Sequence, residues 1–344
     1  MRVRATDVAA RAGVSIATVS RVVNGKGAGR VSADTRIRVE RAVSELGYVV
    51  NPAARSLATG TYGRVALLVH DLVNPFIAAI AAGVSSALGH EVQLLLATGS
   101  TETGPPGATM MAAVGVDGVL LHLEGPLETE TPGPERPGDG LVPVVVLDEP
   151  TGPVGVSRVY FDVTLGAVAL GDHLAGLGHR RVVYLDSTRH RRTFDLRRQT
   201  FASTLAVAGP EVEIIVAEAD LDLQAAKEAV GREIGAWRAR GVTAIVTATD
   251  VQAYGALAAL ADAGVAVPGD LSLASFDDNA MSAITAPPLT TVAMAAGELG
   301  REAALLLVAE MHGTSDPGRA IALPSTLIIR GSTGIRKGPS WPAP

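Results

Sequence analysis

Carboxylates and one amide follow a series of short apolar runs in the larger part of the sequence. They are Asp71, Asn74, Asp148, Asp162, Asp186, Asp250, Asp277 and Asp278. In open α/β sheets, ligands bind outside the carboxyl ends of the strands, so side chains that follow strands can meet at one crevice. Carboxylates beside an arginine suit a polyhydroxylated ligand, because each hydroxyl both donates and accepts hydrogen bonds. Taken singly, each Asp also fits the N-cap of the next helix, and that alternative stays open.

Sequence signatures of catalysis are absent. The chain has no HExxH, GxSxG or Walker phosphate loop, and the Gly-rich residues 25–30 follow no predicted strand, so they fit a flexible turn. Asp277 and Asp278 are adjacent, and adjacent side chains seldom point into the same site. The absence of cysteine excludes disulfides, thiol chemistry and Cys-based zinc sites. We therefore expect a protein that is not an enzyme and that carries no cofactor and no metal.

Charge is distributed unevenly along the 344 residues. Residues 1–60 hold ten Lys/Arg and four Asp/Glu, a net charge of +6, whereas the rest of the chain holds 19 and 31, a net charge of −12. A small basic head on a larger acidic body indicates that the head meets a polyanion such as nucleic acid. A basic surface that arises by chance is the alternative.

The first fifty residues contain the capping signals and the apolar spacing of three helices. Thr6 and Ser15 are candidate N-caps of two short helices, and Gly13 can end the first of them. These two helices are too short to bury enough surface alone, so a third helix over 32–46 must cover them. Its predicted apolar face comprises Ile37, Ala42, Val43 and Leu46. The pattern predicts a helix-turn-helix with a supporting helix over residues 1–47.

The start of the second helix of such a motif enters the DNA major groove. Arg21 can pair with a guanine edge or grip a phosphate, and Ile16 and Ala17 can touch thymine methyl groups. The candidate DNA-contacting residues of the head are Thr6, Ser15, Ile16, Ala17, Thr18, Ser20, Arg21 and Asn24. A small three-helix bundle with a solvated face is the alternative, but it leaves the basic surplus unexplained.

A short helix is predicted within residues 48–61, which form a hinge or linker between the head and the body. Asn51 is a candidate N-cap, Pro52 suits the first helical position, and helix formers continue up to Gly60. About two helical turns are marginal in isolation, so binding to DNA can order them and an effector can release them. The candidate DNA-contacting residues here are Asn51, Arg55, Ser56 and Leu57. From the residues alone, Leu57 either enters the DNA or packs on the body.

From Arg64 onward, short apolar runs alternate with helical stretches. RVALLVH, NPFIAAIAAGVSSALG and EVQLLLAT begin the pattern, and RRVVYLD, TAIVTATD and LSLASFDD continue it. This βαβα rhythm predicts parallel sheets covered by helices. Because the rhythm occurs twice, we predict an N-terminal all-α helix-turn-helix head plus an α/β bilobed core, with two parallel-sheet Rossmann-like lobes facing a cleft.

Motifs in both parts closely resemble the LacI/GalR (lactose-repressor type) family of transcriptional regulators. The head carries the run from Thr6 to Asn24, then VSADTRIRVERAVSELGY and NPAARSLATG. The body carries DLVNPF, LAGLGHRRVVYL, ATDVQAYGALAALADAGVAVPGDLSLASFDD and APPLTTV, in that order. The body is also similar to periplasmic sugar-binding proteins. The resemblance therefore implies a periplasmic-binding-protein-like core.

The resemblance also implies a function and its residues. Ile16, Ala17 and Arg21 fall where the family reads its operator. Leu57 falls where the family wedges a leucine between base pairs in the minor groove. The residues that fall at effector contacts are Asn74, Phe76, Asp148, Asp162, Arg197, Asp250 and Asp277. The implied protein is a homodimeric repressor that binds a pseudo-palindromic double-stranded operator, with an affinity controlled by a small-molecule effector, a sugar or sugar derivative.

Lobe boundaries follow from the same resemblance, which makes the chain cross between lobes near Asp162, Thr290 and Pro324. The first lobe then comprises residues 62–161 and 291–323, and the second lobe comprises residues 162–290 and 324–335. Residues 336–344 are predicted to form a disordered tail. The tail has no apolar heptads, so we expect a dimer rather than a tetramer.

Several positions depart from the family pattern. Val163 and Thr249 stand where Asn is usual beside a ligand-contacting Asp, and Thr200 replaces a usual Gly. The departures leave open which effector binds, and whether a sugar binds at all. A basic run comprises Arg189, His190, Arg191, Arg192, Arg197 and Arg198. This run can receive an anionic sugar phosphate, but we interpret it as a solvated surface.

The N-terminus lacks the apolar segment of an export signal, and no stretch approaches the roughly 18 apolar residues of a membrane span. We therefore expect a cytoplasmic, nucleoid-associated protein with no membrane partner. A periplasmic binding protein would explain the body, but it needs an export signal in place of the basic head. A glycosidase would have to turn over glycosides. The head favours a DNA-binding regulator over both.

Overall fold

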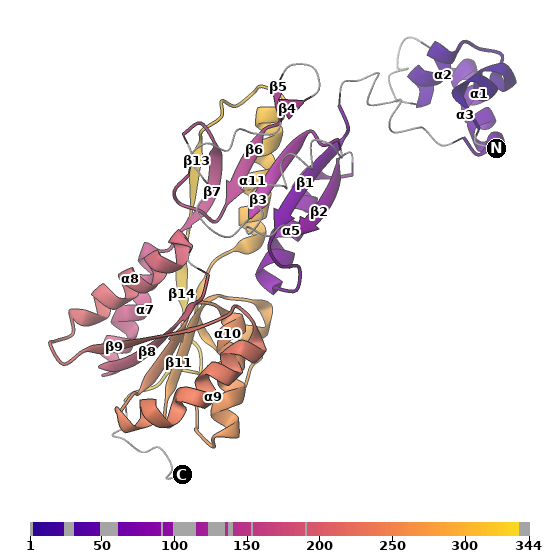
Figure 1. Cartoon of the computed structure of the whole chain (residues 1–344). Coiled ribbons are helices and arrows are strands. Elements are labelled where there is room, and N and C mark those ends of the chain that lie inside the picture. Colours follow the sequence, from indigo (N-terminus) through magenta and orange to yellow (C-terminus); the bar gives the residue numbers. More distant parts are fainter. Residues whose placement is uncertain are drawn as a thin grey trace. The chain divides into compact units, whose positions relative to one another are not determined.

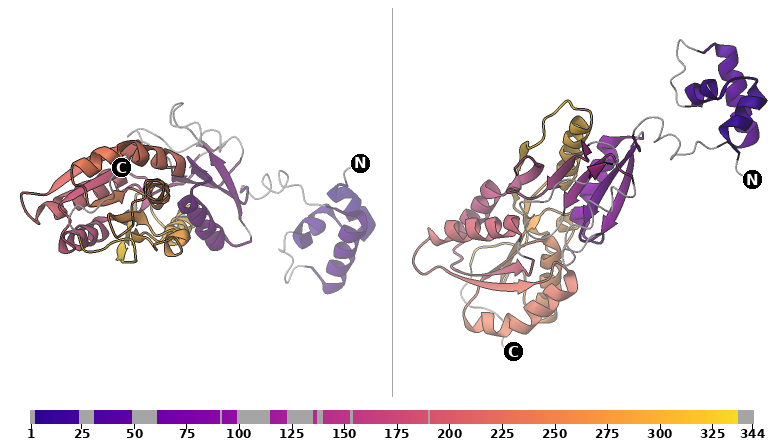
Figure 2. Two further views of the ribbon diagram at one scale, coloured as in Figure 1. Left: turned by 90° about the horizontal axis from the view of Figure 1, so that it is seen from below. Right: turned by 45° about the horizontal axis from the view of Figure 1, so that its top comes forward.

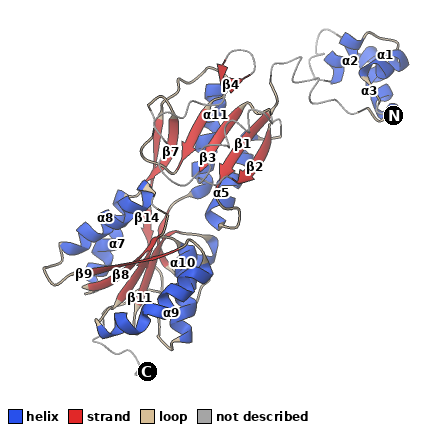
Figure 3. Ribbon diagram, viewed as in Figure 1, coloured by secondary structure: helices blue, strands red, loops and turns tan. Residues whose placement is uncertain are grey.

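The computed structural model describes residues 3–23, 31–48, 61–90, 92–98, 115–122, 135–136, 140–152, 154–189 and 191–336. The chain divides into two compact units, Met1–Gly63 and Arg64–Pro344 (Figure 1). The described residues of the first unit form helices and turns, whereas the second unit combines helices with sheets (Figure 3). Each unit has a hydrophobic core of its own.

The described residues of the first unit form three helices: α1 (Ala5–Ala12), α2 (Ile16–Val23) and α3 (Ala33–Leu46). Gly13 ends α1 in the left-handed conformation, at φ 65°, which a residue without a side chain adopts readily. Ser32 caps α3, because its hydroxyl oxygen accepts a hydrogen bond from the backbone N–H of Thr35. The tight turn between α1 and α2 and the covering α3 confirm the predicted helix-turn-helix.

Two details of the predicted head are wrong. Thr6 is an exposed residue inside α1 rather than its N-cap, since the helix begins one residue earlier. The N-cap is Arg4, and its backbone N–H donates to the Asp7 carboxylate at 2.8 Å. Ile37 is 54% exposed, whereas Val39 is fully buried. The two lie about 200° apart around α3, so Ile37 is off the face that packs on α1 and α2.

Six parallel strands form the first sheet of the second unit, in the order β13-β7-β6-β3-β1-β2. They are β1 (Arg64–Val69), β2 (Gln93–Thr98), β3 (Gly118–His122), β6 (Val144–Leu147), β7 (Ser157–Asp162) and β13 (Ala320–Pro324). Helices α5 (Pro75–Leu88) and α11 (Ala296–Met311) pack against each other and against this sheet. The two-residue strands β4 (Glu135–Arg136) and β5 (Gly140–Leu141) form a separate antiparallel pair.

The second sheet has the order β14-β12-β11-β10-β8-β9, with β14 antiparallel to β12 and the other pairs parallel. Its strands are β8 (Arg181–Ser187), β9 (Glu213–Ala219), β10 (Ala244–Thr247), β11 (Ser272–Asp277), β12 (Thr290–Ala293) and β14 (Thr326–Ile328). Its helices are α7 (Thr164–Gly176), α8 (Arg192–Ala206), α9 (Leu223–Ala239), α10 (Asp250–Asp262) and the 3-10 turn η2 (Ala280–Ala283). Tyr184 of β8 packs into the cluster that contains α7 and α8, and its neighbour Val183 into the cluster that contains α9 and α10. The two helix pairs therefore cover opposite faces of this sheet (Figure 2).

The chain passes between the sheets three times, after β7, after β12 and after β13. The second passage lies later than the predicted crossing at Thr290. Strand β12 pairs with β11 in register from Thr290 opposite Ala274 to Ala293 opposite Asp277, so this segment stays in the second sheet. The segment that returns to the first sheet thus begins after Ala293 rather than at residue 291.

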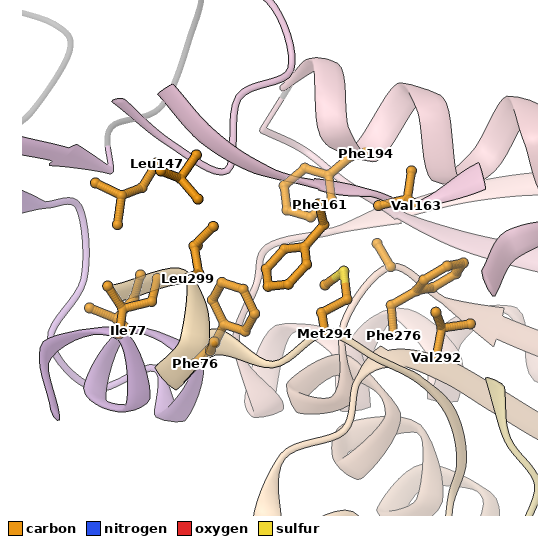
Figure 4. Packing of buried hydrophobic residues seen from close by; sticks show 14 of the residues in the cluster. Phe76, Ile77, Leu147, Phe161, Val163, Phe194, Phe276, Val292, Met294 and Leu299 are labelled. Atoms are coloured by element: carbon orange, nitrogen blue, oxygen red, sulfur yellow. The ribbon is translucent and has the colours of Figure 1, made fainter. Parts of the chain in front are cut away.

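One hydrophobic cluster includes side chains from both sheets. It holds all five Phe residues of the chain: Phe76, Phe161, Phe194, Phe201 and Phe276. Figure 4 shows Phe76, Phe161 and Met294 close together within this cluster. The two lobes therefore share buried apolar surface next to the crossing strands.

Candidate functional site

A cavity in the second unit is lined by residues that follow strands of both sheets. Its lining comprises His70, Asn74, Phe76, Ile77, His122, Asp148, Arg191, Phe194, Arg197, Leu221, Thr249 and Asp277. The first sheet contributes residues after β1 and β6 and the last residue of β3, and the second contributes the last residue of β11 and residues at the starts of α8 and α10. Because the carboxyl ends of parallel strands meet at one edge of each sheet, the two edges bring these side chains to one place.

Arg197 lines this cleft and is almost fully buried. Its Nη2 is 3.8 Å from Oδ2 of Asp148, which follows the first sheet, and its Nη1 is 3.4 Å from Oδ1 of Asp277, which ends β11. The Nη1 atom also donates to the backbone carbonyl of Ala248 at 2.8 Å. The guanidinium group lies over the ring of Phe194, with its central carbon 5.0 Å from the ring centroid. Arg197 therefore joins the two lobes through its charge, whereas its contact with the Phe194 ring lies within its own helix.

Arg191 is buried as well, with 3% of its side chain exposed. Its guanidinium donates to the backbone carbonyl of Asp148 at 2.9 Å and to Nε2 of His122 at 3.2 Å. Both partners belong to the first sheet, whereas Arg191 is the N-cap residue of α8. The interpretation of this basic run as a solvated surface is wrong for Arg191 and Arg197, which are both buried. Arg191 turns into the cleft, where its guanidinium donates to carbonyl groups at the end of β6.

The imidazoles of His70 and His122 stack in the cleft, with 5.4 Å between ring centroids. Burial, followed by the positive charge of Arg191, lowers the pKa of His70 to about 4. Burial and the same Arg191 charge hold the pKa of His122 well below its usual value. Both rings are therefore neutral at neutral pH, and both can take part in hydrogen bonds without adding charge to the cleft.

Asp148 and Asp277 share two unusual properties. Their backbone φ angles are positive, 52° and 122°, a region that is strained for a residue with a side chain. Burial raises the pKa of both carboxyl groups, most strongly for Asp277, and nearby arginine charges oppose the rise. Strained backbone and perturbed carboxyl groups on either side of one arginine are typical of a functional site.

The structure brings together five of the seven predicted effector-contacting residues: Asn74, Phe76, Asp148, Arg197 and Asp277. The other two, Asp162 and Asp250, do not line the cavity. Asp162 is exposed at the end of β7, where its Oδ1 accepts from the backbone N–H of Thr164 at 3.0 Å. Its carboxylate binds the first backbone N–H of α7, but the N-cap residue of that helix is Val163 rather than Asp162.

Asp250 is buried, but its carboxylate is already occupied. It accepts hydrogen bonds from the hydroxyls of Ser282 at 2.5 Å, Thr291 at 2.8 Å and Ser275, and from the backbone N–H of Asn279 at 2.7 Å. These donors come from β11, β12 and η2. Asp250 thus holds three elements of the second lobe together, and its neighbour Thr249 lines the cleft in its place.

Several lining residues were missed by sequence reasoning. His70 and His122 sit where two apolar runs end, RVALLVH and GVLLHL, and this position was a usable signal. Phe194 lies three residues before Arg197 on the same helix, so the two share a face. Thr249 was noticed only as a departure from the family pattern.

In the head, α2 presents one exposed face. Ser15, Ile16, Ala17, Ser20 and Arg21 are exposed there, and Ile16 has half of its surface open to solvent. Thr18 is half-buried, and its backbone N–H donates to the Ser15 hydroxyl at 3.2 Å. This mixture of one arginine, hydroxyls and apolar tips matches the chemistry that reads base edges and phosphates. Asn24, Asn51, Arg55, Ser56 and Leu57 lie outside the described residues.

Within the part of the chain that the structure describes, no group of three or more His, Cys, Asp or Glu could hold a metal ion. Among the described helices, none combines the length and the apolar character that a membrane crossing requires.

Comparison with known proteins agrees with both parts of this geometry. A model of bacterial regulatory proteins of the lacI family matches residues 6–51, and a model of the periplasmic binding protein-like domain matches residues 171–333. The HTH-type transcriptional regulator CelR of Thermobifida fusca is 35% identical over 337 residues, which cover 94% of this chain and 96% of CelR. The chain belongs to the LacI family. The regulator MalR of Streptomyces coelicolor is another relative of this LacI-family chain, 32% identical over 350 residues and covering 98% of both chains.

Two solved structures resemble this LacI-family protein over nearly its full length. A lac repressor dimer bound to operator and the anti-inducer ONPF superposes with a TM-score of 0.82, at 26% identity, covering 97% of this chain and 100% of that chain. A complex of the transcriptional regulator CelR with cellobiose gives a TM-score of 0.67, at 32% identity, covering 96% of this chain and 100% of that chain.

Proposed function

We propose that this LacI-family chain is a transcriptional repressor that binds operator DNA as a homodimer and changes its operator affinity when a sugar or sugar derivative enters the cleft. The observation that carries the proposal is a cleft whose buried arginines contact both lobes, in the same chain as an exposed recognition helix. The lac repressor neighbour is a dimer bound to operator, and the CelR neighbour is bound to cellobiose, which supports the same reading.

The order of the segments along the chain suggests how effector binding is coupled to operator binding. We propose that residues 1–47 bind DNA and that residues 48–61 act as a hinge, with Leu57 entering the minor groove. Residues 48–61 are followed within three residues by β1, and β1 ends at Val69, next to His70 in the cleft. A ligand that changes how the lobes close around Arg197 therefore acts on the strand that continues the hinge. The coupling must be reciprocal, because operator and effector bind one molecule.

Footprinting of genomic fragments with the purified full chain tests this function. We expect protection of a near-palindrome, with an affinity that falls steeply with salt and that changes when a sugar binds. Titrations of sugar with and without the protected DNA give one coupling factor. Titrations of the DNA with and without sugar should give the same factor. The proposal is overturned if no fragment shows a protected palindrome, with or without candidate sugars. A tetramer in light scattering would contradict the homodimer.

A further inference from the structure

The two buried arginines of the cleft have donors that nothing in the described structure satisfies. The Nε–H groups of Arg191 and Arg197 are buried and lack a hydrogen-bond partner among the described residues. A buried N–H without an acceptor costs free energy that a bound acceptor would restore. Both arginines line the same cavity, so one ligand can reach both.

The positive charge of the pair is also incompletely matched. Both guanidinium groups approach the same carboxylate oxygen, Oδ2 of Asp148, at 3.9 Å from Arg191 and 3.8 Å from Arg197. These distances are too long for direct hydrogen bonds. The nearest carboxylate contact of the pair is Asp277, 3.4 Å from Arg197. Buried charges require close partners with good geometry, which Arg191 lacks among the described carboxylates.

His122 adds a third donor. Arginine can only donate, so the hydrogen bond from Arg191 makes Nε2 of His122 an acceptor and places the imidazole proton on Nδ1. This Nδ1 is buried and has no partner among the described residues. The matching unsatisfied acceptor at the cleft is Oδ1 of Asp148. Among these four residues, the open hydrogen-bonding capacity is therefore three donors and one acceptor.

We propose that the effector is an acidic sugar derivative, whose carboxylate or phosphate group binds Arg191 and Arg197 and whose hydroxyl donates to Asp148. The anion supplies the acceptors that the Nε–H groups lack, and it supplies the charge that Asp148 provides only at a distance. A neutral sugar can satisfy the hydrogen bonds but brings no negative charge close to Arg191, whose nearest described carboxylate oxygen, Oδ2 of Asp148, is 3.9 Å away. This inference rests on the proposed function and specifies the ligand class of the same cleft.

Calorimetric titration of the full chain tests the ligand class. Uronates, aldonates and sugar monophosphates are each compared with the neutral parent sugar, so the carboxylate and phosphate arms are separated. We expect at least one acid to bind tenfold or more tightly than its parent. The proposal is overturned if every neutral parent binds as well as its acids, or if no acid binds.

Variants test the assignment of the anion to Arg191. Arg191→Gln should reduce the affinity for the acid tenfold or more and remove the preference over the neutral parent. Arg192→Gln is the matched control, because Arg192 is exposed on the first turn of α8 and should leave both affinities unchanged. Should Arg191→Gln fail to fold, Arg191→Lys replaces it: it keeps the charge, so the preference for the acid should persist at lower affinity. Equal acid affinity in Arg191→Gln and the parent chain overturns the assignment.

The operator readout separates this inference from the function on which it rests. If a neutral sugar changes operator affinity and acids do not, the chain is a regulator with a different ligand class. If neither kind of ligand changes operator affinity, both proposals fail.

Discussion

Arg197 of α8 and Asp148 at the end of β6 face each other from opposite lobes, with 3.8 Å between Nη2 and Oδ2 and both side chains almost fully buried. Asp148→Asn should therefore lower the free energy of unfolding by about 3 kcal/mol, because it leaves two buried guanidinium groups without their shared charge. Urea titration measures the loss. Asp262→Asn, which breaks an exposed ion pair with Lys227, is the control and should change stability by no more than about 0.5 kcal/mol. Equal effects of the two variants would contradict a role for the buried charge.

Asp250→Asn separates structural from ligand-binding carboxylates. An amide nitrogen cannot accept the hydrogen bonds that the carboxylate receives, so at least one buried donor loses its partner, at about 1–3 kcal/mol. Because Asp250 does not line the cavity, the effector affinity of the folded variant should stay within a few-fold of the parent chain. Thermal melts and ligand titration measure the two quantities. A large loss of affinity at unchanged stability would return Asp250 to the binding site.

Helices α5 and α11 approach so closely that Gly83 admits no side chain. A Cβ there would lie 1.9 Å from the backbone oxygen of Gly297. Gly83→Ala should therefore lower the free energy of unfolding by about 1–3 kcal/mol or more, because the backbone of one of the two helices must move. Gly231→Ala makes the same chemical change at an exposed position of α9 with nothing within 4 Å, and should stabilise by about 0.5–1 kcal/mol. Opposite signs in denaturant unfolding are the expected result.

Acidification should destabilise the folded chain partly through His70. Its pKa is lowered to about 4, so between pH 6.5 and 4 the unfolded chain binds a proton that the folded chain does not. Stability should fall as the pH decreases through this window, by at most about 1.4 kcal/mol per pH unit. Buried Asp277, with its raised pKa, contributes with the opposite sign, so the comparison must be made between variants. His70→Asn should flatten the pH dependence of the urea midpoint relative to the parent chain.

Arg21→Ala tests the head. If Arg21 pairs with a base, the substitution should cost about 1–3 kcal/mol of operator binding and relax the preference at one base pair. Fluorescence anisotropy on operator variants measures both effects. Arg41→Ala, at an exposed position on α3, is the control and should leave that preference intact. A uniform loss on every DNA sequence would instead identify Arg21 as a phosphate contact.

Local signals predicted the elements better than they predicted the site. Gly13 and Ser32 mark helix ends because capping is a local property, and the apolar runs of the body become the strands of two sheets. An Asp after a strand has two uses that one sequence does not distinguish. Asp148 reaches the cleft, whereas the Asp162 carboxylate is exposed and accepts a hydrogen bond from the backbone N–H of Thr164.

The remaining differences depend on contacts between distant segments. Arg191 looked like one of several surface arginines, and it is buried because His122 and the carbonyl of Asp148, far away in sequence, receive its hydrogen bonds. The donors around Asp250 come from residues 25 to 41 positions away. The extent of β12 depends on its pairing with β11, and no local sequence pattern predicts that pairing.

The three passages of the chain between the sheets mean that neither lobe is a continuous piece of the gene. A fragment that stops at Asp162 lacks β13, the edge strand that pairs with β7, and lacks α11, whose Leu307 packs against Gly118 of β3. Such a fragment would expose the face that α11 covers and should aggregate rather than fold. Dissection of effector binding from DNA binding therefore has to cut at residues 48–61 and keep everything after them intact.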